Sequence, residues 1–368
     1  MRITIPQPQF LKHLQMVEHA VNDRSTLPIL ANVLLETTEQ ELTLTATDLD
    51  VGIQCRFPLT PPIERGAVAL PARKLTAIIR ELPDESMVLE AKKNHTATLS
   101  CGTSNFRIPG LPAEDFPVLP TENQGEGIRI PQHELKRLIT QTAHAMSMEE
   151  TRFILNGALL TTHKNTLTMV ATDGRRLAIS TTPLPEAGKE PLQAVIIPAK
   201  TIRELGRLLQ DDDVEEVTIT ALKDNQLALR FGAVTVVTRL IEGQFPAHEK
   251  VVPAPSKQGL TCDRTALINA TRRASLMTTA ASQAIIFELQ RDRLTVLKES
   301  SELGSVSEEV AVSYTGEPMS IAFNPEFWLD VLRVLPVDDV MVELTGPERP
   351  AVIRQPDFLY LVLPMKIA

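Results

Sequence analysis

One seven-residue sequence pattern occurs three times along this chain at a nearly constant spacing. The segment 42–48 (LTLTATD) returns 125 residues later as 167–173 (LTMVATD), with five of seven letters identical. A degraded third copy (LTVLKES) begins at Leu294, 127 residues after Leu167, and keeps the alternation while losing the ATD. Repeats of this length are whole domains, because the units of solenoid proteins are only about 20–50 residues long.

A second landmark recurs in the same order and supports the repeat. It is found in the segments 67–82, 194–209 and 320–335. Within it, Pro71 precedes Pro198 by 127 residues, and Pro198 precedes Asn324 by 126. Each repeat reads as a strand, a helix and alternating strands, followed by a second set of the same kind. We therefore predict an α+β fold of three repeated domains, each with two helices packed on antiparallel sheets.

Polar or Pro-rich segments mark the expected domain boundaries. The segment 121–127 (TENQGEG) is polar and rich in Gly, and 251–259 (VVPAPSKQG) is rich in Pro. These segments predict domains at residues 1–124, 125–251 and 252–368. Pro at or just before a first turn predicts helices that begin near Pro131, Pro198 and Pro325.

Composition places the chain in the soluble globular class. It has 368 residues, 43% of them hydrophobic, and no run of 18 apolar residues that would span a membrane. Cys55, Cys101 and Cys262 are odd in number and widely spaced, which favours a reducing cytoplasm. The chain contains no Gly-rich phosphate loop, HExxH or CxxC motif. We expect a cytoplasmic protein that is not an enzyme and needs neither cofactor nor metal.

Positive charge is concentrated in the predicted helices, and negative charge in the rest of the chain. The predicted helical segments are 9–22, 72–82, 132–147, 199–210, 264–277 and 325–335. Together they carry +7, so the other residues must carry −16 to give the net charge of −9. A basic helix face can simply be solvated. Alternatively, the helices face a common polyanion while the acidic outer surface avoids nonspecific contact.

Several phrases, in order, resemble the bacterial DNA polymerase III beta subunit, the sliding clamp. They are RSTLPILANVLL (24–35), LPARK (70–74), ILNGALL (154–160), ATDGRRLA (171–178), EGQFPAHEKVVP (242–253) and LVLPMKIA (361–368). The resemblance covers the whole chain. It implies that two three-domain subunits join head-to-tail into a ring of six domains, with the helices around duplex DNA. Such a homodimer slides on DNA without sequence preference, and tethers the polymerase III alpha subunit and other proteins with a clamp-binding motif after a clamp loader has placed it.

The resemblance implies DNA contacts at Arg24 and Arg73. Weaker DNA-binding candidates follow from helix placement: Lys136, Arg137, Lys200, Arg203, Arg207, Arg272 and Arg273. Glu149, Phe153 and Ile154 match a DNA-contacting loop in which the family commonly carries Gln and two Tyr. The carboxylate of Glu149 would repel phosphate, and the loop has no Tyr hydroxyl.

The resemblance also implies a cleft for partner peptides. By position it comprises Leu155, Thr172, Gly174, Arg175, Arg176, Leu177, Pro246, Val251, Leu361, Val362, Leu363, Pro364 and Met365. Aliphatic walls with a pliable Met suit an anchor pocket. Leu155, Leu177 and Val362 could equally be ordinary core residues. The apolar end of the chain favours the cleft, since terminal residues are usually polar.

The subunit contact implied by the resemblance joins the first domain of one chain to the third domain of the other. Its expected residues are Lys74, Phe106, Arg107, Leu276, Met277, Glu308 and Glu309. Thr103 and Asn105 stand where the family tends to be basic.

Two other readings stay open at this point. One is a clamp paralogue dedicated to repair or to antibiotic resistance, which would have the same sequence features. The other is an enzyme or small-ligand-binding protein built from duplicated domains, because repeated folds do not exclude catalysis. Charge sorting and the apolar end of the chain favour the clamp.

Overall fold

The computed structural model describes residues 1–60, 63–120, 127–184, 192–212, 214–314 and 316–366. Its contacts divide the chain into two compact units. The first comprises Met1–Leu135, Pro185–Leu192 and Arg203–Leu240, and the second comprises Lys136–Leu184, Gln193–Ile202 and Ile241–Ala368. The expected boundary at residue 124 lies outside the described residues. The other, at residue 251, coincides with the end of a short 3₁₀ helix.

The six predicted helices are confirmed, with ends that differ by a few residues. They are α1 (Gln7–Val17), α2 (Ala72–Arg80), α3 (Gln132–Thr142), α4 (Ala199–Leu208), α5 (Arg264–Ser275) and α6 (Pro325–Val334). Short 3₁₀ helices are η1 (Glu18–Ala20), η2 (Pro28–Ala31), η3 (Ala113–Asp115), η4 (Ala143–Ala145), η5 (Glu150–Leu155) and η6 (His248–Val251). None of the described helices is both long and apolar enough to cross a membrane.

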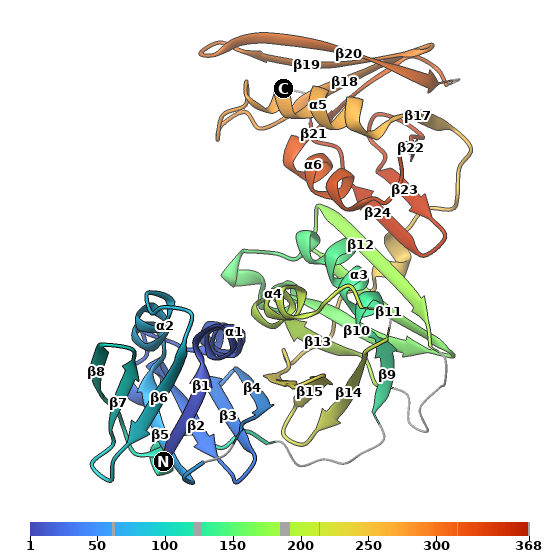
Figure 1. Ribbon diagram of the computed structural model, residues 1–368. Coiled ribbons are helices and arrows are strands. Elements are labelled where there is room, and N and C mark those ends of the chain that lie inside the picture. Colours follow the sequence, from blue (N-terminus) through green and yellow to red (C-terminus); the bar gives the residue numbers. More distant parts are fainter. Residues whose placement is uncertain (61–62, 121–126, 185–191, 213, 315, 367–368) are drawn as a thin grey trace. The chain divides into compact units, whose positions relative to one another are not determined.

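The first unit contains two antiparallel sheets (Figure 1). The four-stranded sheet has the order β1 (Arg2–Pro6), β6 (Ser86–Ala91), β7 (Thr96–Cys101), β8 (Ser104–Pro109). The eight-stranded sheet has the order β5 (Gly66–Pro71), β2 (Asn32–Thr37), β3 (Glu41–Thr47), β4 (Val51–Pro58), β16 (Val234–Arg239), β15 (Gln226–Phe231), β14 (Glu216–Leu222), β9 (Ile128–Pro131). Helices α1 and α2 contact each other and this second sheet.

The second unit is built on one twelve-stranded sheet. Its order is β13 (Val195–Pro198), β10 (Gly157–His163), β11 (Thr166–Thr172), β12 (Arg176–Pro183), β24 (Phe358–Val362), β23 (Ala351–Gln355), β22 (Asp339–Glu343), β17 (Gly259–Asp263), β20 (Gly304–Tyr314), β19 (Arg293–Ser300), β18 (Ile285–Gln290), β21 (Met319–Phe323). Helices α5 and α6 lie side by side against it (Figure 1).

Apolar spacing explains how the helices pack. Phe10, Leu14, Val17 and Val21 recur every three or four residues and are all buried. In the second unit, Trp328 on α6 is buried against Phe287 and Phe323, with ring centroids 5.2 Å apart in both pairs. Side-chain caps start two helices: Asp263 accepts the N–H of Ala266 and begins α5, and Asn324 caps α6.

Successive repeats are joined by strand pairing. In the first unit, β4 of the first repeat pairs with β16 of the second, so that Gly52 lies opposite Val237. In the second unit, β12 of the second repeat pairs with β24 of the third, so that Leu177 lies opposite Leu361. We call these two pairings the seams. The repeated ATD phrase ends the strand that precedes each seam strand, so the same turn stands beside both seams.

Candidate functional site

The turn between β11 and β12 is fixed by its own side chains. Thr172 Oγ1 donates to the carbonyl of Arg176 at 2.6 Å and accepts the N–H of Gly174 at 3.0 Å. Asp173 Oδ1 accepts the N–H groups of Arg175 and Arg176 at 2.8 and 3.0 Å. Gly174 has φ +85°, a left-handed conformation that a residue with a Cβ rarely adopts. The ATD-Gly phrase therefore builds a rigid turn at the seam.

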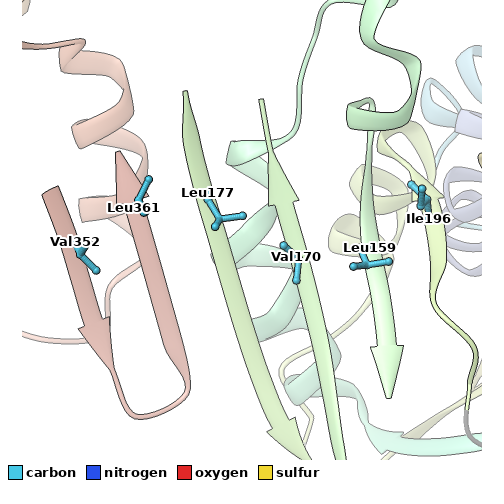
Figure 2. Packing of buried hydrophobic residues seen from close by; sticks show 6 residues of the cluster. All are labelled: Leu159, Val170, Leu177, Ile196, Val352 and Leu361. Atoms are coloured by element: carbon cyan, nitrogen blue, oxygen red, sulfur yellow. The ribbon is translucent and has the colours of Figure 1, made fainter. Parts of the chain in front are cut away.

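A row of aliphatic side chains crosses the sheet beside this turn (Figure 2). The row has one residue on each of six neighbouring strands: Leu159, Val170, Leu177, Ile196, Val352 and Leu361. Half-buried Ile154, Phe245 and Val252, from outside the sheet, pack against the row. Two distant loops and the seam strands thus share one apolar layer.

Apolar side chains remain exposed near the end of the chain. Two backbone bonds fix this end, one to the turn and one to β21: the N–H of Leu363 donates to the carbonyl of Arg175 at 2.8 Å, and that of Met365 to Ala322 at 2.7 Å. The side chains of Leu363 and Met365 keep 41% and 37% of their surface exposed. Val251 in η6 is also exposed. We call Val251, Leu363 and Met365 the apolar rim. Exposed apolar side chains on a fixed backbone suit a partner that supplies its own apolar groups.

Arg176 joins the turn to helix α6. Its Nε donates to Asp173 Oδ2 at 3.1 Å, and its Nη1 donates to Asp330 Oδ2 at 2.7 Å. The guanidinium carbon lies 4.3 Å from the centroid of the Phe327 ring. Only 11% of the Arg176 side chain is exposed. Arg176 therefore holds the backbone that supports the rim and is not itself available to a partner.

His144 lies behind Arg176 in the same unit. Its ring centroid is 5.5 Å from that of Tyr360, whose hydroxyl donates to the carbonyl of Phe327 at 2.8 Å. Burial, followed by the positive charge of Arg176, lowers the pKa of His144 from 6.5 to about 4. The imidazole is neutral at physiological pH.

We expect this histidine to make the protein less stable in mild acid. Between pH 6.5 and 4 the unfolded chain binds a proton at His144 that the folded chain does not bind, so the free energy of unfolding falls as pH falls. The full effect is about 3 kcal/mol. Chemical denaturation of the wild type and of His144→Gln at pH 7 and pH 4.5 measures it. The wild type should lose more stability than the variant, and equal losses would contradict this role.

The predicted cleft residues are brought together, but not all on the surface. Leu177 and Val362 are buried, as the core interpretation expected, and Leu361 is buried as well, whereas Leu155 is only half-buried. Gly174, Arg175 and Pro246 are exposed, while Thr172 and Pro364 are half-buried. Sequence reasoning missed the rest of the apolar layer. Strand alternation would have found Leu159, Val170, Ile196 and Val352, whereas Phe245 and Val252 lie outside the strands and follow no such pattern.

The two principal DNA candidates lie close together in the first unit. Arg73 at the start of α2 pairs with Asp23 at 2.6 Å, and Asp23 directly precedes exposed Arg24 in a turn. Arg203 and Arg207 are exposed on α4, and Lys136 and Lys200 are half-buried. Arg137 differs from these, because its guanidinium donates to Gln141, Ser180 and the carbonyl of Thr181 within its own unit.

The loop that carries Glu149, Phe153 and Ile154 in place of the family's Gln and two Tyr has two parts with different contacts. Glu149 pairs with Arg152 at 3.1 Å, and Arg152 donates to the carbonyl of Asp173 at 2.9 Å, so the loop is tied to the ATD turn. Phe153 is exposed, whereas Ile154 packs on the apolar layer. Ile154 thus lies with the cleft residues, although its sequence position suggested DNA.

The expected subunit-contact residues lie at strand edges and a helix end. Phe106, Arg107 and Lys74 are exposed, and β8 is the last strand of its sheet within the described residues. Leu276 is exposed just after α5, and Met277 is half-buried.

The acidic candidates for that contact already have partners in their own chain. Arg273 binds Glu308 through two bonds of 2.7 and 2.6 Å, and this lowers the pKa of the Glu308 carboxyl. Glu309 pairs with Arg293 at 3.3 Å. The structure thus pairs Arg273, a DNA candidate, with Glu308, an interface candidate.

Comparison with known proteins agrees with this architecture. Models of the N-terminal, central and C-terminal domains of the DNA polymerase III beta subunit match residues 1–120, 129–247 and 249–366. The beta sliding clamps of Pseudomonas putida and Caulobacter vibrioides are 35% and 33% identical to the chain, each over the full length of both proteins.

Solved structures give the same result. The Pseudomonas aeruginosa sliding clamp bound to griselimycin is 34% identical with a TM-score of 0.93, and the Bacillus subtilis sliding clamp is 29% identical with a TM-score of 0.92; both alignments cover the whole of each chain. Three repeated α+β domains joined by strand pairing define a clamp-type fold. The chain belongs to the DNA polymerase III beta subunit family, the sliding clamps of DNA replication.

Proposed function

We propose that two copies of this chain close head-to-tail into a ring around duplex DNA, and that the ring tethers the replicative polymerase without any chemistry of its own. The observation that carries the proposal is the match of all three family domains, in order, over nearly the whole chain. Holding a polymerase on the template raises its effective concentration at the primer end. The ring then acts through topology and needs no catalytic residue.

Contact with DNA in this proposal is electrostatic and independent of sequence. Exposed Arg24 and Arg73 of the first unit, with Arg203 and Arg207 on α4, supply positive charge. Attraction to phosphates carries no base information and weakens with salt, so it permits sliding. The acidic remainder of the chain disfavours DNA elsewhere on the surface. Glu149 of the altered loop would not add to phosphate binding.

The apolar rim is the proposed binding surface for partner peptides. Leu363, Met365 and Val251 offer apolar contacts, while Gly174 and Arg175 add a fixed polar edge. The proposed partners are the alpha subunit of DNA polymerase III, the clamp loader and other proteins that carry a clamp-binding motif. All would act in the cytoplasm.

The proposed subunit contact uses two strand edges. Strand β8 exposes Asn105, Phe106 and Arg107. Residues 304–309 of β20 pair with β19 on one side, and only residues 312–314 pair with β17 on the other. Open strand edges are ready to pair with another chain. Phe106 would then meet Leu276 of the second copy.

Encirclement can be tested by cutting the DNA. The protein is loaded onto nicked circular DNA with its clamp loader and ATP, isolated, and the circle is cut once. We expect retention on the intact circle and release after the cut. The matched control is the same cut DNA with biotin–streptavidin blocks at both ends, which should retain a ring. Equal retention on open and blocked linear DNA would mean ordinary contact binding and would refute the ring.

A further inference from the structure

The connector between the second and third repeats, residues 252–258, has little backbone bonding to the sheet. Two of its seven residues are proline and have no N–H group to donate. Within the described part of the chain, no backbone–backbone hydrogen bond joins residues 252–257 to a strand. The connector follows directly on Val251 of the apolar rim, and its first residue, Val252, packs on the apolar layer. Groups that fix the connector therefore also fix one part of the rim.

Two charged side chains of the third repeat bind the connector. Arg354 Nη2 donates to the carbonyl of Pro253 at 3.3 Å, and Glu343 Oε2 accepts the N–H of Ser256 at 3.3 Å. The two side chains are also joined to each other, because Arg354 Nε donates to Glu343 Oε1 at 3.0 Å and its Nη2 to Oε2 at 3.5 Å. One ion pair thus holds the connector at two points.

The ion pair lies beside the apolar layer, on the same face of the sheet. Glu343 on β22 is directly opposite Val352 on β23, and such opposite residues point to one face. Arg354 is two residues after Val352, so it points to that face as well. The Glu343 side chain is only 9% exposed. The aliphatic row, which ends at Val352 in Figure 2, is therefore followed on β22 by a nearly buried carboxylate.

Packing alone does not require an ion pair at this position. Taking a carboxylate and a guanidinium out of water is costly, and well-packed apolar residues in place of a buried pair are often as stable or more stable. What apolar residues could not provide are the hydrogen bonds to the Pro253 carbonyl and the Ser256 N–H. The distinct contribution of the pair is therefore its hold on the connector.

We propose that Glu343 and Arg354 are positioning residues for partner binding, which hold the connector so that Val251 is presented at a fixed place in the apolar rim. The inference rests on the proposed function, because the rim is there assigned to partner peptides. An anchor that is already fixed loses less conformational entropy on binding than a mobile one. The pair thus increases affinity without touching the peptide.

The test replaces the ion pair by two apolar side chains in the full chain. Glu343→Met together with Arg354→Met should keep Tm close to that of the wild type, but it removes the bonds to Pro253 and Ser256. We expect the affinity for a peptide from the polymerase alpha subunit to fall about tenfold in a fluorescence titration, the loss typical of one interface anchor. The matched control Lys257→Met changes an exposed charge of the connector itself and should alter neither affinity nor Tm.

A double-mutant cycle distinguishes positioning from a general loosening of the fold. Val251→Ala should weaken peptide binding in the wild type but not in the chain with both Met substitutions, where Val251 is no longer held. Leu363→Ala should weaken binding by the same factor in both chains. The proposal would be overturned if the doubly substituted chain bound the peptide like the wild type, or if Val251→Ala had the same effect in both backgrounds.

Hydrogen exchange follows the connector without any peptide. The Ser256 amide should exchange about tenfold faster or more in the doubly substituted chain, because its acceptor is gone, and unchanged exchange would contradict the proposal. If the peptide failed to bind even the wild type, the rim assignment of the proposed function would fail, whereas the exchange of Ser256 would still decide whether the ion pair holds the connector.

Arg354→Lys provides the answer if the doubly substituted chain does not fold. Lysine keeps a positive charge beside Glu343 but lacks the planar fork that reaches both Glu343 and the Pro253 carbonyl. We expect normal protection of the Ser256 amide and a loss of about threefold in peptide affinity, the value of one hydrogen bond. Wild-type affinity of this variant would then overturn the proposal.

Discussion

A chain with both Leu363 and Met365 changed to Ser should lose partner-peptide binding by a factor on the order of 100. Each residue is an exposed apolar contact of the rim, and loss of one such anchor costs about 1–2 kcal/mol, so together they reach the roughly 3 kcal/mol that corresponds to 100-fold. Fluorescence titration with a peptide from the polymerase alpha subunit measures the affinity. Primer extension on a long template should show the same loss of processivity.

Two companion variants make this result specific. The double Ser variant keeps both backbone bonds of the tail, whereas a chain that ends at Val362 loses both and should also fail to bind polymerase. A chain that ends at Met365 keeps the rim and should bind normally. All three should still be retained on circular DNA, since none changes the proposed subunit contact. If the chain that ends at Val362 stimulated the polymerase normally, the assignment of partner binding to the apolar rim would be refuted.

Arg176→Met should destabilise the second unit by about 3 kcal/mol, the low end for breaking a buried ion pair. The change leaves the carboxylates of Asp173 and Asp330 without the cation that both contact, and it removes the group that packs on Phe327. Chemical denaturation at pH 7 measures the loss. Since the charge of Arg176 lowers the pKa of His144, the variant should also raise that pKa.

The neighbouring residue provides the control. Arg175 is exposed, so Arg175→Met should change stability by less than about 0.5 kcal/mol. Adding Asp330→Asn to Arg176→Met should recover part of the loss, because one of the two carboxylates that Arg176 contacted is then uncharged. If Arg175→Met and Arg176→Met proved equally stable, the ion pairs of Arg176 with Asp173 and Asp330 would contribute nothing to stability.

Local sequence patterns predicted most of the fold. The residue roles that they did not predict depend on side-chain contacts between residues that are far apart in the sequence. Helix starts followed from Pro131, Pro198 and Pro325, because proline limits the backbone locally. The roles of basic residues were harder to assign. Arg137 bonds residues more than 40 positions away, and Arg273 bonds Glu308 at a separation of 35. Such contacts cannot be predicted from the spacing of residues within one segment of the sequence.

The seams also say something about how such a chain could have arisen. A single ancestral repeat, alone, would have had the ATD turn but no neighbouring strand to receive it, because β16 and β24 each come from the next repeat along. Duplication therefore did more than enlarge the protein: each new copy created a junction with groups that neither copy possessed alone. Mutations could then alter the two junctions independently, as Leu49 and Gly174 at matching positions illustrate. In this view, new surfaces arose where copies were joined, before any residue changed.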